Sequence, residues 1–162
     1  MKELLIIRSV SFQQLDMNLK EIIRTYPEHK ITLLTHEHGV KLAEKYKSIN
    51  EIVVYPYKKS FSRLRTVEGL KDKKFDVVII PVTNITGAGF SNVLWFAKTI
   101  KAQRHVICNL VSHFQEITIL DIVLNGVKNV AFTLLSGIFT GMVGLFAIIY
   151  LLFTLSRIEK KE

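Results

Sequence analysis

The sequence predicts an α/β domain with a parallel sheet, followed by one transmembrane helix. Through residues 1–110, short apolar runs alternate with segments of helical periodicity. That pattern is typical of buried parallel strands joined by crossover helices. Residues 129–156 then contain no Lys, Arg, Asp, Glu or His. This run is longer than the roughly 20 apolar residues that a helix needs to cross a bilayer.

The first two strand–helix units lie in residues 1–47. The apolar run at 4–7 predicts a strand, and Leu15, Leu19 and Ile22 show the spacing of a helix over 12–26, which Pro27 ends. A second strand is predicted at 31–34. The helix after it is predicted over 40–47 from its apolar spacing.

Three further strands are predicted at 52–55, 75–80 and 105–110. The segment 61–70 between the first two is predicted to be a basic helix, and 90–100 a helix that packs on the sheet through Trp95 and Phe96. With right-handed crossovers, these units predict a Rossmann-like, doubly wound parallel sheet of about five strands over residues 1–113.

The remaining chain is divided into three parts. Residues 114–128 have a polar stripe on an apolar helix, which suits either the headgroup boundary or packing on the domain as a final helix. Residues 129–156 form the predicted transmembrane helix, and 157–162 a polar tail. Gly137, Gly141 and Gly144 share one stripe of the span, which favours packing against a second membrane helix.

The composition indicates the cellular location of the chain. The net charge is +8, and the tail holds only three bases and two acids, so the basic excess belongs to residues 1–128. An anionic leaflet is the partner expected for it, and no nucleic-acid motif accompanies it. The first thirty residues show no secretory signal and Cys108 is the single cysteine. We therefore expect a single-pass membrane protein whose soluble domain is cytoplasmic.

Four cations in the densest basic region are candidates for headgroup contact, with a solvated helix face as the alternative. They are Lys58, Lys59, Arg63 and Arg65.

No metal and no cofactor are expected. His36, His38 and His113 follow strands, where a metal could bind, but surface histidines are commoner there. The pair Gly87-x-Gly89 could receive phosphate, although position 92 is Asn and a tight turn is favoured.

Several blocks in order carry a resemblance to a known family. They are KELLIIR at 2–8, LKEIIRTYPEHKITLL at 19–34, INEIVVY at 49–55 and KFDVVII at 74–80. Residues 1–113 resemble the N-terminal lobe of the ADP-heptose:lipopolysaccharide heptosyltransferases. This resemblance implies a GT-B glycosyltransferase, in which the N-terminal lobe receives the acceptor and a second lobe binds the nucleotide sugar. Here the membrane span stands where the second lobe is expected.

The resemblance also implies a Gly-Asp pair after the first strand, with the Asp as general base. In this chain the pair falls on Gln13 and Gln14, and a glutamine amide cannot take a proton at neutral pH. Asp16 is the nearest carboxylate that could replace it. The acceptor-loop candidates are Arg8, Ser9, Gln13, Asn84, Gly87 and Gly89.

Two functions remain open. The first is a membrane-anchored glycosyltransferase-like half domain, inactive alone, that positions an acceptor for a partner; any transfer activity would be of the hexosyl or heptosyl type. The second is a structural or docking subunit of a larger membrane complex. In either case the partner is expected at the transmembrane helix, at the carboxyl edge of the sheet, or at both.

Overall fold

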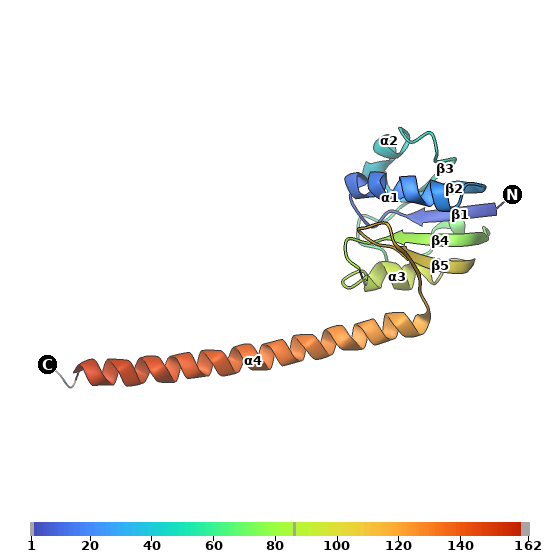
Figure 1. The fold of residues 1–162 in the computed structure, drawn as a ribbon. Coiled ribbons are helices and arrows are strands. Elements are labelled where there is room, and N and C mark those ends of the chain that lie inside the picture. The colour runs from blue at the N-terminus through green and yellow to red at the C-terminus, as the bar shows by residue number, and fades with distance from the viewer. Residues whose placement is uncertain (1, 86, 160–162) are drawn as a thin grey trace. The chain divides into compact units, whose positions relative to one another are not determined.

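The computed structural model describes residues 2–85 and 87–159 and contains two units. The first runs to Val123 and the second begins at Leu124. Figure 1 shows that the first unit is a sheet with helices packed on it, whereas the second belongs to one long helix.

The first unit is built on a six-stranded sheet in the order β3-β2-β1-β4-β5-β6. β1 to β5 are parallel, and β6 runs antiparallel to β5. The strands are β1 (Lys2–Ile7), β2 (His29–His36), β3 (Glu51–Tyr55), β4 (Phe75–Pro81), β5 (Ala102–Cys108) and β6 (Phe114–Glu116). The predicted α/β class with a mostly parallel sheet is confirmed, and β6 was not predicted.

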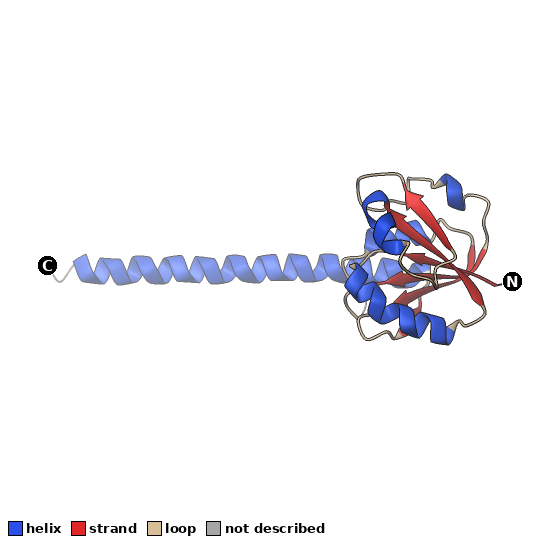
Figure 2. Ribbon diagram, turned by 90° about the horizontal axis from the view of Figure 1, so that it is seen from above, coloured by secondary structure: helices blue, strands red, loops and turns tan. Residues whose placement is uncertain are grey.

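Helices cover both faces of this sheet (Figure 2). Leu4 and Ile6 of β1 point to the face covered by α1 (Phe12–Thr25) and α2 (Val40–Ala43). Leu5 and Ile7 point to the opposite face, which α3 (Ser91–Ala97) covers. All four side chains are fully buried. Because side chains alternate along a strand, one continuous apolar run supplies both cores.

Helix α1 agrees closely with its prediction. The Ser11 hydroxyl caps it by accepting from the backbone N–H of Gln14 at 3.3 Å. The helix ends at Thr25, before Pro27. The other helices are shorter than predicted: α2 stops at Ala43 after a 3₁₀ turn, η1 (Glu37–Gly39), and α3 stops at Ala97.

The basic helix predicted over 61–70 is wrong. This crossover is irregular and contains only a 3₁₀ turn, η2 (Glu68–Leu70). Thr66 and Val67 are β-branched, and Gly69 favours helix poorly. The cations of this stretch also do not form one helical face, because Arg63 and Arg65 lie over rings from two different elements.

The predicted connecting helix over 114–128 is only partly observed. Residues 114–116 form β6, because they pair with the end of β5. Helix α4 (Ile119–Glu159) then begins at a reciprocal cap, in which the Thr118 N–H donates to Asp121 Oδ2 at 2.7 Å and the Asp121 N–H to Thr118 Oγ1 at 3.2 Å. Ile122, in its first turn, is buried in the core of the first unit. The helix is continuous through residue 128.

The stretch Ile119–Leu152 of α4 is long and apolar enough to cross a membrane. Its apolar side chains beyond residue 123 are exposed. It is a candidate span by length and composition. Gly137, Gly141 and Gly144 lie within it. Of the predicted tail 157–162, residues 157–159 belong to α4 and 160–162 lie outside the described residues.

Candidate functional site

The carboxyl edge of the sheet carries an open groove of about 340 Å³. It lies where the strand order reverses, between β1 and β4, which is the position where open α/β sheets bind ligands. The loops after β1, β2, β3 and β4 all contribute to it. The lining residues are Arg8, Ser9, Val10, His36, His38, Ser60, Phe61, Gly89, Phe90, Asn92 and Val93.

Arg8 is the cation of this groove. Its Nε donates to Thr35 Oγ1 at 2.7 Å, and one terminal nitrogen donates to the Val10 carbonyl at 3.1 Å. The guanidinium also lies over the Phe12 ring, 4.7 Å from its centroid. Within the described part of the chain no carboxylate forms an ion pair with it. Burial lowers the pKa of Arg8, yet a guanidinium remains charged in proteins.

Gly39 makes room for this arrangement. A Cβ at position 39 would lie 2.3 Å from Thr35 Oγ1 and 3.3 Å from two nitrogens of Arg8. Thr35 is itself fully buried at the end of β2. The absence of a side chain at Gly39 therefore allows Thr35 to hold Arg8 at the groove.

Two imidazoles, those of His36 and His38, stand beside Arg8. A terminal nitrogen of Arg8 lies 3.3 Å from His38 Nε2, and since a guanidinium only donates, this nitrogen of His38 accepts. His36 stacks on His38 with ring centroids 5.6 Å apart. Burial lowers the pKa of His36, and the charge of Arg8 lowers it further. The bond to the Lys59 carbonyl acts in the opposite direction but does not outweigh burial. Both rings offer hydrogen-bonding nitrogens beside Arg8.

These histidines do not gather into a metal centre. Across residues 2–85 and 87–159, no three His, Cys, Asp or Glu side chains are grouped so that they could hold a metal ion. His113, considered together with them in the sequence, precedes β6 and does not line the groove.

Ser9 and the loop after β4 form the opposite side of the groove. The Ser9 hydroxyl donates to the Pro81 carbonyl, which ties the end of β1 to the end of β4. Asn84 does not line the groove but shapes its loop, accepting from the Gly87 N–H at 2.6 Å and donating to the Ala88 carbonyl at 2.6 Å. Gly87 and Gly89 have φ of 74° and 83°, so this turn requires glycine at both positions.

The candidates for the general base lie away from the groove lining. Asp16 accepts a hydrogen bond from the Tyr46 hydroxyl; burial and this contact raise the pKa of Tyr46 to about 12. Gln14 is buried and donates to Asn18 Oδ1 at 3.0 Å and to the Leu110 carbonyl at 3.3 Å. Gln13 is exposed on α1. Gln14 thus has a structural role, and Asp16 is paired with Tyr46.

The predicted headgroup cations lie on the irregular crossover. Arg63 and Arg65 line a second cavity, of about 290 Å³, whereas Lys58 is at the β3 loop beside His36. The Lys59 carbonyl lies 3.4 Å from His36 Nε2. The glycine stripe of α4 is open, since a Cβ at Gly137, Gly141 or Gly144 would meet no atom within 4 Å.

Sequence reasoning overlooked Thr35, Gly39, Phe61 and Asn92. Thr35 and Gly39 could have been found from the sequence. Because β1 and β2 are neighbouring parallel strands, residues at and just after the end of β2 lie beside Arg8, which follows β1. Phe61 and Asn92 come from an irregular crossover and a short helix, which local patterns do not place at the groove.

The groove can bind an anion. It offers one half-buried guanidinium with unused donors, the amide of Asn92 and two imidazoles, and none of its lining residues is a carboxylate. Comparison with models of protein families, with curated protein sequences and with solved structures finds no match for the chain.

Proposed function

We propose that this protein is a membrane-anchored accessory domain that positions a phosphorylated acceptor for a glycosyltransferase partner. The observation that carries the proposal is Arg8, a half-buried cation without a carboxylate partner in the described chain, held at a groove of about 340 Å³. A phosphate or other acidic group of an acceptor supplies the anion that such a site attracts.

The fold supports the same proposal. We interpret the strand order β3-β2-β1-β4-β5, with helices on both faces, as a Rossmann-like half of a doubly wound domain. In the heptosyltransferases, which residues 1–113 resemble, the N-terminal lobe is the one that receives the acceptor. We assign α4 as the span that holds this domain at the cytoplasmic face of a membrane, where a lipid-linked acceptor would be presented.

We propose that the domain is not catalytic alone. The groove has no carboxylate among its lining residues, and Asp16 is engaged by Tyr46. Proton abstraction from a sugar hydroxyl needs a base within hydrogen-bond reach of that hydroxyl. Sugar transfer by the purified chain, lost in an Asp16→Asn variant, would contradict this part of the proposal.

The binding test uses the full chain in a neutral detergent, titrated with a hexose phosphate and followed by calorimetry. Arg8→Gln should weaken binding at least about tenfold, because a hydrogen bond to a charged group contributes about 1.5–3 kcal/mol. Arg8→Lys keeps the charge and should retain part of the affinity. Arg24→Gln, which removes an exposed arginine of α1, is the matched control and should bind normally. Equal affinity of all four proteins would refute the role of Arg8.

A second candidate is a structural subunit that docks through α4. The observation in its favour is the stripe of Gly137, Gly141 and Gly144, which leaves the helix backbone open to a neighbour. Purification in gentle detergent separates the two functions. Co-purification of a nucleotide-sugar-binding protein supports the first, and stoichiometric recovery with integral membrane subunits of an unrelated complex supports the second.

A further inference from the structure

A second cavity lies between α3 and the irregular crossover, away from the carboxyl-edge groove. Its volume is about 290 Å³, and its apolar floor is formed by Val67, Leu70, Phe96 and Ile100, all buried in the core that α3 covers. Residues 61–70, beside α3 at this cavity, contain only the 3₁₀ turn η2 and not the predicted helix.

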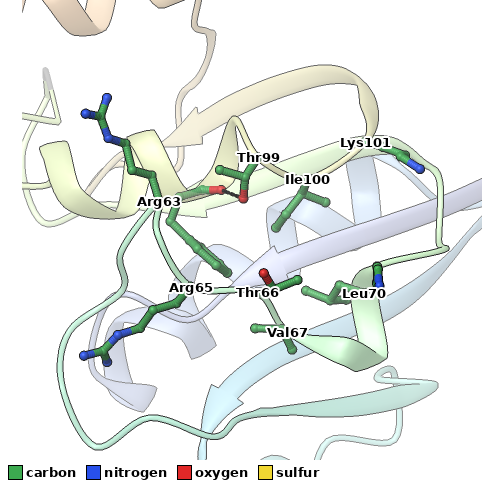
Figure 3. A pocket seen from close by; sticks show the side chains of 10 residues that line it. Arg63, Arg65, Thr66, Val67, Leu70, Thr99, Ile100 and Lys101 are labelled. Atoms are coloured by element: carbon green, nitrogen blue, oxygen red, sulfur yellow. Dashed lines mark hydrogen bonds between the residues drawn. The ribbon is translucent and has the colours of Figure 1, made fainter.

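Four cations surround this apolar floor. Arg63 and Arg65 extend from one side of Val67, Leu70 and Ile100, and Lys101 extends from the other (Figure 3). Their charged ends point outward, so they form the rim of the cavity. Lys71 is the fourth and follows η2. None of the lining residues is acidic. Glu68 and Asp72, the acidic residues nearest in the sequence, form no ion pair with these cations.

The two arginines are held in place by aromatic rings. The guanidinium of Arg63 lies over Trp95, 5.6 Å from the ring centroid, and that of Arg65 lies over Tyr57 at 4.6 Å. Stacking orders a guanidinium without using its N–H donors, which lie in the plane of the group. Within the described chain, no side-chain hydrogen bond or ion pair involves Arg63, Arg65, Lys71 or Lys101. Their donors remain available for a ligand.

The ligand must match both the cations and the apolar floor of the cavity. Leu64, between the two arginines in the sequence, is 86% exposed but does not line the cavity. An apolar floor rimmed by cations is suited to the boundary between headgroups and acyl chains, where apolar burial and attraction to anionic lipid act together. A soluble anion would satisfy the cations but leave the apolar floor uncovered.

The geometry points to an anionic phospholipid as the ligand of this cavity, with its phosphate at the cationic rim and the start of an acyl chain on the apolar floor. This inference goes beyond the proposed function, because it assigns a ligand to a cavity that acceptor binding does not use. It commits to a single lipid bound at a defined site rather than to general attraction of a basic protein to a membrane.

The test counts lipid bound to the full chain by native mass spectrometry from neutral detergent. The probes are short-chain phosphatidic acid, short-chain phosphatidylcholine and inorganic phosphate. We expect one saturable site for phosphatidic acid. The fluorescence of Trp95, the single tryptophan, should change over the same concentration range because Arg63 lies over its ring.

The decisive variant is Lys71→Gln/Lys101→Gln, which leaves both stacked arginines intact. It should raise the half-saturating concentration of phosphatidic acid about thirtyfold, given the usual contribution of a lysine near anionic lipid. Lys20→Gln/Lys41→Gln is the matched control, since it removes the same charge from exposed positions of α1 and α2. The control should bind phosphatidic acid like the unmodified chain.

Four outcomes would overturn the inference. They are no saturable phosphatidic acid site, equal binding of phosphatidylcholine, equal occupancy by inorganic phosphate alone, and the same affinity in the decisive and control variants. Arg8→Gln distinguishes the two cavities, because it should impair hexose phosphate binding at the groove and leave phosphatidic acid binding unchanged. Failure at one cavity therefore does not decide the other.

Discussion

The contact between Gly39, Thr35 and Arg8 makes a sharp prediction for Gly39→Ala. Gly39 has φ of −91° and ψ of −13°, which alanine adopts without strain, so any cost must come from the new Cβ. That atom would lie 2.3 Å from Thr35 Oγ1, whereas nonbonded heavy atoms prefer about 3.5–4.0 Å. Thr35 is fully buried and must move by about 1 Å to relieve the overlap.

The expected cost combines overpacking with a weakened bond from Arg8 to Thr35. Overpacking a core costs about 1–3 kcal/mol, and a hydrogen bond to a charged group contributes about 1.5–3 kcal/mol. Since the two effects overlap, we expect the free energy of unfolding to fall by about 2–3 kcal/mol. Urea unfolding of the full chain in mild detergent, followed by the fluorescence of Trp95, measures this change.

A double-mutant cycle identifies the cause. In a Thr35→Ala background the obstructing hydroxyl is gone, so the cost of Gly39→Ala should fall by more than about 1 kcal/mol. Gly126→Ala is the control, because its Cβ would meet no atom within 4 Å and should not destabilise the sheet. If Gly39→Ala costs the same with and without the Thr35 hydroxyl, the steric explanation is refuted.

Three further predictions concern buried polar groups. Asn18→Ala should lower the free energy of unfolding by about 2–3 kcal/mol, because it removes the bonds from Asn18 to the Asn109 carbonyl and the Ser112 hydroxyl and the acceptor of the buried Gln14 amide. Urea titration would show this, with Gln13→Ala as an exposed control. Burial raises the pKa of the Cys108 thiol to about 12, so the folded chain should resist iodoacetamide at pH 8 and react only when unfolded; rapid alkylation seen by mass spectrometry would contradict its burial. Burial is the main cause that lowers the pKa of His105 in the folded chain, so the unfolded chain binds a proton more readily. The free energy of unfolding should therefore keep the full contribution of His105 above about pH 6.5 and lose it as the pH falls below that value. His105→Gln should flatten that decline, and an unchanged pH dependence would exclude this histidine as its source.

The central strands could be predicted from sequence because their signal is local. Apart from Asp76, the strand Phe75–Pro81 is apolar and buried on both faces, and its predicted bounds differ from the observed ones by a single residue. β5 was predicted over 105–110 and lies over 102–108, because its first residues include exposed Gln103 and Arg104. β6 has only three residues, too few to show any periodicity.

The candidate site could be predicted only in part, because its geometry depends on contacts between distant residues. Arg8 was identified from its place after the first strand, but the Thr35 that holds it is 27 positions away. The pairing of Asp16 with Tyr46 is also long-range, and it lies outside the groove. The second cavity was not predicted, because its lining residues Arg63–Leu70 were predicted to lie on a regular helix.

Because Thr35 and Gly39 together position the Arg8 guanidinium, these three residues should co-vary in evolution. A change at any one of these positions removes the reason for the other two, so selection should act on them as a group. In related chains we expect an arginine after the first strand to be inherited together with Thr-x-x-x-Gly at the end of the second. Where both that arginine and the threonine have been lost, we expect larger residues at position 39 and no binding of the anion at the groove.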